Sequence, residues 1–105
     1  MPTQRVQLPN KLAGETKFYS FDFTGDLAPS EAFSTKVVTA SVYSGVDASP
    51  SSLISGSALD DNPRVKQLIT AGVPGVIYEL KCTVTTYTGQ TLIRTGFVAI
   101  PGELP

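Results

Sequence analysis

From Val76 to Thr86 apolar side chains recur at every second position, in alternation with Ile77, Glu79, Lys81, Thr83 and Thr85. The apolar positions of this run are Val76, Tyr78, Leu80, Cys82 and Val84. Because successive side chains of a strand point to opposite faces, a period of two predicts a strand with one buried face. Residues 87–90 follow as a hairpin turn in which Gly89 supplies a positive backbone angle, and a return strand is predicted from Thr91 to Ile100.

Two further runs, residues 16–23 and residues 36–44, show the same alternation. Their apolar faces are Tyr19, Phe21 and Phe23 in the first run and Val38, Ala40 and Val42 in the second. Both runs stop at glycine, at Gly25 and at Gly45, in segments with turn chemistry. Each run therefore predicts one strand that covers a core on one side.

Four segments have weaker patterns. Residues 5–8 predict a short edge strand, and a short strand is expected around residues 52–55, followed by a loop over residues 58–62. Residues 63–71 fit either a short helix begun by proline or a strand in which every second side chain is buried. We favour the strand, because the segments on both sides of it are predicted strands.

About seven short strands and no convincing helix indicate an all-β chain, most simply an antiparallel sandwich of two sheets. The single cysteine, Cys82, excludes an internal disulfide. We assign residues 16–100 to the sandwich and residues 1–15 to an N-terminal arm or edge strand. Residues 101–105 are expected to form a C-terminal tail.

The composition of the 105 residues excludes several classes of function. There is no histidine, so His-based catalysis and His-ligated metals are excluded. Eight basic and nine acidic residues give a net charge of −1, which provides no field to attract nucleic acid or an acidic membrane. No stretch resembles a signal peptide or a membrane span, so we expect synthesis in the cytoplasm.

Candidate chemical sites all have simpler explanations. The acidic residues Asp47, Asp60 and Asp61 do not have EF-hand spacing and are expected to be solvated loop carboxylates. Cys82 is in phase with the buried face of its strand, which predicts an inert core thiol. Residues 72–75 lack the Gly-Lys-Ser/Thr ending of a phosphate loop and are expected to form a turn.

Phe18, Tyr43 and Phe97 would suit a platform for single-stranded nucleic acid only if basic residues lay between them. Only Lys17 and Arg94 adjoin these aromatics, so packing in a core or an interface is the better interpretation. Taken together, these residues predict no catalytic, metal-binding or cofactor-binding site, and no enzyme.

Residues 72–86, followed by Gly89, resemble the F strand and F–G hairpin of an immunoglobulin-like domain. The resemblance implies that Tyr78 is a structural tyrosine corner, with its ring in the core and its hydroxyl bonded to the preceding turn. Leu80 stands where antibody domains have their second disulfide cysteine, and there is no tryptophan. The chain is therefore similar to the disulfide-free immunoglobulin-like sandwiches of bacteria and their viruses.

A narrower resemblance is carried by the order of the motifs at residues 41–47, 51–56 and 67–72, together with the aromatic first strand and the Tyr78 hairpin. Over residues 16–100 the chain resembles small immunoglobulin-like structural proteins of tailed bacteriophages and prophages. The resemblance implies a virion component that is made in the bacterial cytoplasm and binds other virion proteins, either major capsid or neck and tail proteins. It carries over no catalytic residues.

Two features could serve assembly. Val6 and Leu8 place alternate apolar side chains on the N-terminal arm, which could add as a strand to a neighbouring sheet or form the edge of its own sheet. Thr83, Thr85 and Thr86, with the neighbouring Tyr87, predict an uncharged hydroxyl face that suits a protein contact, although it could equally face solvent.

The sequence thus indicates a non-enzymatic virion structural protein, with a capsid decoration or cement protein as the first interpretation. The alternatives are a neck, tail or fibre-associated virion protein and an adhesion or carbohydrate-binding module. We expect a homo-oligomer or a lattice-bound copy that binds other virion proteins and neither nucleic acid nor membrane. No cofactor is expected.

Overall fold

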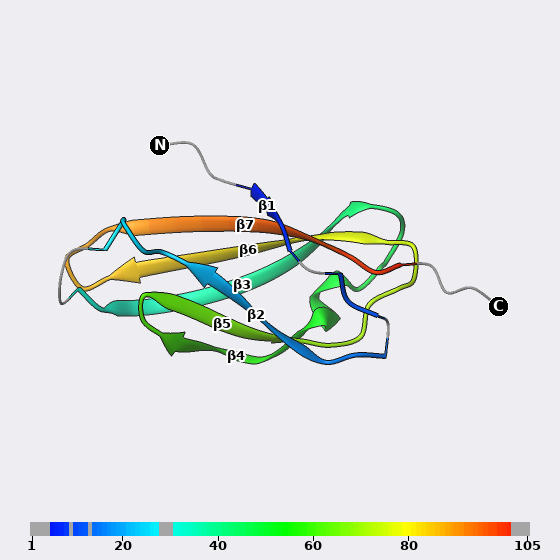
Figure 1. Ribbon diagram of the computed structural model, residues 1–105, viewed down its shortest axis with the longest axis horizontal. Coiled ribbons are helices and arrows are strands. Elements are labelled where there is room, and N and C mark those ends of the chain that lie inside the picture. Colours follow the sequence, from blue (N-terminus) through cyan, green and yellow to red (C-terminus); the bar gives the residue numbers. More distant parts are fainter. Residues whose placement is uncertain (1–4, 9, 13, 28–30, 102–105) are drawn as a thin grey trace.

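The computed structural model describes residues 5–8, 10–12, 14–27 and 31–101, with residues 5–7 described by their backbone alone. Within these residues, seven strands and one short 3-10 helix make up the regular structure. Figure 1 shows how the strands are arranged. They are β1 (Arg5–Gln7), β2 (Lys17–Asp22), β3 (Phe33–Ser44), η1 (Pro50–Leu53), β4 (Ile54–Asp61), β5 (Arg64–Ile69), β6 (Ile77–Thr86) and β7 (Thr91–Ala99).

The strands form two sheets. One has four strands in the order β1-β7-β6-β3, and the other has three strands in the order β2-β5-β4. This order confirms the predicted immunoglobulin-like sandwich, with one departure from a purely antiparallel arrangement. The first strand pairs in parallel with β7 rather than joining the sheet of β2, whereas the other strand pairs are antiparallel.

The core lies between the sheets and consists of the alternating apolar positions. The predicted inner face of β6 is confirmed, because Tyr78, Leu80, Cys82 and Val84 are all completely buried. Tyr19, Phe21 and Phe23 are buried in the same way opposite them. Fully burying one such side chain stabilises the fold by roughly 1.5–3 kcal/mol. Alternation along the strands therefore accounts for the two-layer packing.

Strand β5 confirms the preferred interpretation of residues 63–71, since Val65, Gln67 and Ile69 point inward and the strand pairs with β2 on one side and with β4 on the other. The predicted loop over residues 58–62 is wrong. Most of it belongs to β4, which continues to Asp61 past an irregularity between Ser55 and Leu59.

The irregularity in β4 is accommodated by a buried amide. The Nε2 of Gln67 donates to the carbonyl oxygens of Ser55 and Gly56, at 3.0 and 3.2 Å. These hydrogen bonds connect the irregular stretch of β4 to β5, and the strand continues beyond it. The short strand expected around residues 52–55 is also partly wrong, because Ser52 and Leu53 lie in η1 and extended structure begins at Ile54.

The N-terminal segment follows β7. Val6 is in register with Gly96, the Leu8 N–H donates to the Phe97 carbonyl at 2.9 Å, and the Lys11 N–H donates to the Ala99 carbonyl at 3.1 Å. The arm thus forms the edge of its own sheet in this structure. Beyond residue 101, the predicted C-terminal tail lies outside the described residues.

Lys11 is a buried anchor that the sequence pattern did not reveal. Its side chain is inaccessible to solvent, and Nζ donates to the carbonyl oxygens of Ala71 and Leu12. Burial lowers the pKa of Lys11. The ammonium group holds the end of the arm against the turn between β5 and β6, where Ala71 has a positive φ of 56°.

Candidate assembly surfaces

The outward side of the four-stranded sheet carries two of the predicted contact residues. Thr83 lies between Val37 on β3 and Ile93 on β7, and Thr85 lies between a threonine on each of the same two strands. Val37 is 54% exposed. We call this surface the outer face of the four-stranded sheet. Around Thr83 and Thr85 it combines hydroxyl groups with aliphatic side chains, and the charged residues Lys81 and Glu79 follow on the same side of β6.

Thr86 does not belong to this surface, so its prediction is wrong. It is 2% exposed, because it is one residue out of phase with Thr85 and its side chain turns inward. Its hydroxyl accepts a hydrogen bond from the N–H of Gln90 at 3.1 Å and lies 3.0 Å from the Thr88 hydroxyl. Thr86 therefore fixes the β6–β7 hairpin rather than presenting a contact.

Tyr87 is 75% exposed and lies at the tip of this hairpin, directly after β6. Its backbone N–H donates to the carbonyl of Ala32, which positions the tip against the start of β3. Of the two arm residues, Leu8 packs partly buried against the core of its own domain. The side chain of Val6 lies outside the described part of the structure.

The three aromatic residues considered as a platform are not brought together. Tyr43 and Phe97 form a tilted pair on the outer face of the four-stranded sheet, with ring centroids 4.5 Å apart. Phe18 lies on β2 in the other sheet, where the Nζ of Lys66 is 5.4 Å from its ring centroid. Two aromatics thus lie on the outer face, where Glu79 is in register with Phe97, and the third is separated from them by the core.

Tyr78 joins three segments of the chain through its hydroxyl. The oxygen accepts a hydrogen bond from the N–H of Val73 at 2.9 Å, and the hydroxyl donates to Oδ2 of Asp47 at 2.6 Å. Burial raises the pKa of Tyr78, and the hydrogen bond from Tyr78 lowers the pKa of Asp47. The other carboxylate oxygen of Asp47 accepts from the Ser49 N–H, so this carboxylate holds a loop in place.

The other predicted loop carboxylates are not in a loop. Asp60 and Asp61 form the exposed end of β4, and Asp60 accepts a hydrogen bond from the N–H of Asn62. Across the described ranges, no three Asp, Glu, Cys or His residues gather where they could hold a metal ion.

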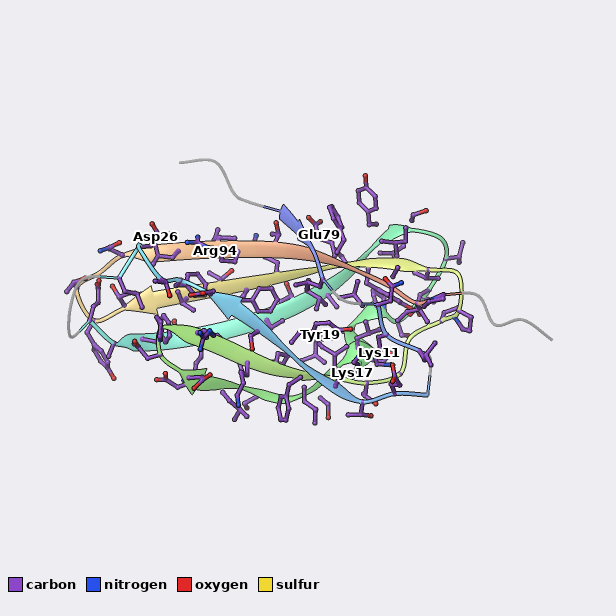
Figure 2. The ribbon with its side chains drawn as sticks, in the orientation of Figure 1. Lys11, Lys17, Tyr19, Asp26, Glu79 and Arg94 are labelled. Atoms are coloured by element: carbon purple, nitrogen blue, oxygen red, sulfur yellow. The ribbon has the colours of Figure 1, made fainter. Side chains whose placement is uncertain are left out.

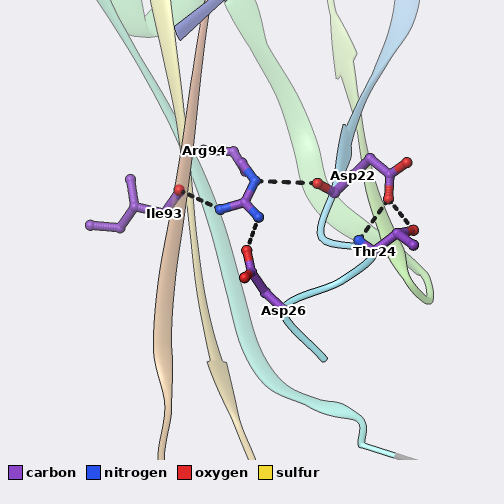
Figure 3. Close-up of polar contacts among 5 residues, drawn as sticks. All are labelled: Asp22, Thr24, Asp26, Ile93 and Arg94. Atoms are coloured by element: carbon purple, nitrogen blue, oxygen red, sulfur yellow. Dashed lines mark hydrogen bonds and ion pairs between the residues drawn. The ribbon is translucent and has the colours of Figure 1, made fainter. Parts of the chain in front are cut away.

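Several polar groups gather around the guanidinium of Arg94. The sequence analysis did not predict this role. Its guanidinium donates to the carbonyl oxygens of Ile93 and Asp22 and contacts the carboxylate of Asp26, as Figure 3 shows. The group also lies 4.8 Å from the ring centroid of Phe23. Arg94 thereby ties β7 to the segment after β2, at the end of the sandwich opposite Lys11 (Figure 2).

The position of Arg94 in the alternation of inward and outward residues along β7 could have revealed this role. Arg94 is in register with the buried Cys82, and a charged side chain at an inward position requires a buried partner.

Burial raises the pKa of the Cys82 thiol to about 12, which leaves little thiolate at neutral pH. The predicted turn at residues 72–75 is stabilised by a backbone hydrogen bond, in which the Gly75 N–H donates to the Ile100 carbonyl at 2.8 Å.

These surfaces can be compared with known protein families. Residues 11–99 match the model of a family described as the podophage GP4 fiber-tail adaptor protein gp77. The chain belongs to this family. The match includes all of the sandwich except β1. No curated protein matches the chain.

Membership of the gp77 family makes the protein a structural component of a bacteriophage virion, associated with the tail and its fibres. The predicted virion component is thus supported, whereas the predicted decoration of the capsid is not. The match favours the alternative of a tail or fibre-associated protein.

In the described residues, no helix has the length and apolar character needed to cross a membrane.

Proposed function

We propose that the protein is a non-enzymatic adaptor that connects tail fibres to the tail of a podophage. The family match over residues 11–99 carries this proposal, because it includes six of the seven strands and their connecting loops. An adaptor must bind two different virion proteins at once. A small rigid sandwich suits this task, since two sheets and their edges offer separate surfaces on one stable core.

The outer face of the four-stranded sheet is one of these contacts in our proposal. Thr83 and Thr85 lose little desolvation free energy on burial and can pair with a partner's polar groups. Tyr43 and Phe97 add aromatic area on the same face, and Tyr87 adds an exposed ring at the hairpin tip. Aromatic anchors with a polar surround are typical of protein interfaces.

Repetition strengthens such contacts. Copies arranged with the symmetry of a tail would engage their partners at several sites, so that individually weak contacts add through avidity. Binding also stabilises the assembled state by mass action, without any chemical step. No cofactor is needed for this function.

Quantitative mass spectrometry of purified particles tests the proposal. The expected result is that the protein is present in a small, fixed ratio to the fibre protein, and that particles lacking it also lose their fibres. A copy number near that of the major capsid protein, or absence from the particle, would overturn the adaptor function.

A double substitution tests the proposed contact surface. Thr83→Lys with Thr85→Lys places two charges on the outer face and should abolish fibre attachment while the domain remains folded. The matched control is Ser51→Lys with Ser52→Lys, which adds the same charge to exposed positions of η1. Equal attachment in the two variants would exclude the outer face as a contact.

A further inference from the structure

Strand β3 forms one edge of the four-stranded sheet and pairs, within the described chain, on one side only, with β6. It is twelve residues long, and its pairing with β6 is regular from Thr35 to Val42. Its only charged residue is Lys36, and it contains neither glycine nor proline. A long, regular and nearly uncharged edge is a template for pairing with another strand.

The other sheet edges carry features that discourage pairing. In the described part of the chain, strand β1 has three residues, and β2 has six, with Lys17 and Asp22 at its ends. Strand β4 is interrupted between Ser55 and Leu59 and ends in two aspartates. Short length, charge and irregularity are the usual protections of an edge strand. The absence of such protection along β3 singles out this edge.

A pocket of about 210 Å³ lies beside the β3 edge, between the two sheets. Its apolar lining comes from Val37 and Val38 on β3 and from Ile54 and Ala58 on β4. Gly56, also in the lining, has no heavy atom within 4 Å of the position that a Cβ would occupy. A strand added to β3 would direct every second side chain to this side of the sheet, where the pocket can receive an aliphatic group.

Lys36 indicates which chemistry would suit a strand at this edge. It lines the same pocket, is partly exposed, and has no ion-pair partner among the described residues. A second copy of β3 would bring no carboxylate, because Lys36 is the only charge on that strand. A partner segment with an acidic residue would complement it.

We propose that an extended segment of another virion protein adds to β3 as a strand, with an aliphatic side chain in the pocket and a carboxylate beside Lys36. This inference rests on the proposed adaptor function and identifies one of its two docking surfaces. Main-chain hydrogen bonds would supply affinity, whereas the pocket and Lys36 would set the register and select the partner.

Cross-linking in assembled particles tests this inference. Val37, exposed on β3, is replaced by the photoreactive residue p-benzoylphenylalanine, and the same residue replaces Ser20 on β2 as a control for the protected edge. We expect the probe at position 37, and not that at position 20, to cross-link to one segment of another virion protein that contains both an aliphatic and an acidic residue.

Several results would overturn the proposal. If the protein is present in the particle but position 37 cross-links to a second copy, to no protein, or to a segment without an acidic residue, strand addition fails and the adaptor function stands. Absence of the unsubstituted protein from the particle would instead refute the adaptor function itself.

Charge reversal provides a second measurement. Lys36→Glu should reduce the yield of this cross-link about tenfold, and Lys36→Arg, which keeps the positive charge, should retain it. Reversing the charge of the acidic residue identified in the partner should restore the yield with Lys36→Glu. Equal cross-linking yields for the glutamate and arginine variants would show that charge complementarity does not select the partner segment.

Discussion

The hydroxyl of Tyr78 lies 2.6 Å from Oδ2 of Asp47, although the two residues are 31 positions apart in the chain. The same hydroxyl accepts from the N–H of Val73, so both its donor and its acceptor capacities are used. One buried phenol therefore holds the loop after β3 and the turn before β6 in a fixed relation to the core.

Replacing Tyr78 by phenylalanine should lower the free energy of unfolding by about 1–3 kcal/mol, because the partly buried Val73 N–H loses its acceptor. Urea denaturation followed by fluorescence or circular dichroism measures this change. The matched control is Tyr87→Phe, which removes a hydroxyl from an exposed ring and should change stability by less than about 0.5 kcal/mol. Equal losses would show that the hydrogen bond contributes nothing specific.

Asp47 should make stability depend on pH in the acid range. Its pKa is lowered from 3.8 in the folded state, first by the Tyr78 hydroxyl and then by the Ser49 N–H, so the unfolded chain binds its proton more readily. The resulting stabilisation is present above pH 3.8 and is lost as the pH falls through the folded pKa.

Asp47→Asn should therefore cost more stability at pH 6 than at pH 2.5, as measured by urea unfolding at both values. In a Tyr78→Phe background this difference should shrink, because the larger cause of the lowered pKa has been removed. An unchanged difference in that background would assign the pH effect to the Ser49 contact alone.

Arg94→Leu should destabilise the fold by about 2–3 kcal/mol, since it breaks charge-assisted hydrogen bonds and leaves Asp26 partly buried without its cation. Arg94→Lys should recover only part of this loss, because an ammonium cannot reproduce the planar fork. The control is Arg64→Leu, whose half-exposed side chain lies 4.0 Å from Asp22 and should cost about 1 kcal/mol or less. Thermal or urea unfolding distinguishes these outcomes.

Gly72→Ala should destabilise the protein more than Gly25→Ala. Both glycines have positive φ, 106° and 95°, so alanine introduces backbone strain of about 1–2 kcal/mol at either position. Only at Gly72 would the new Cβ meet another atom, 2.9 Å from Cδ1 of Ile100. Adding Ile100→Val should reverse part of the extra loss, and a failure to do so would place the cause in the backbone.

Much of the fold could be predicted because alternation along a strand is a local property. The period of two placed Tyr78, Leu80 and Cys82 on a buried face, and the same rule placed Thr83 and Thr85 outside. The prediction failed where local rules were applied loosely, as for Thr86, which is out of phase with the other two threonines. Residues 58–62 contain turn-forming residue types, which predict a loop. These residue types do not reveal that the side chain of Gln67 supports the strand past its irregularity.

Strand faces, the hairpin and the exclusion of histidine and disulfide chemistry followed from residue types and spacing alone, since each depends on neighbours a few positions away. The parallel placement of β1, the pairing of Arg94 with Asp26 and the open edge of β3 beside a pocket depend on segments that meet only after folding. Such contacts are selected by the packing of two complete sheets, because no short stretch of the chain contains both partners.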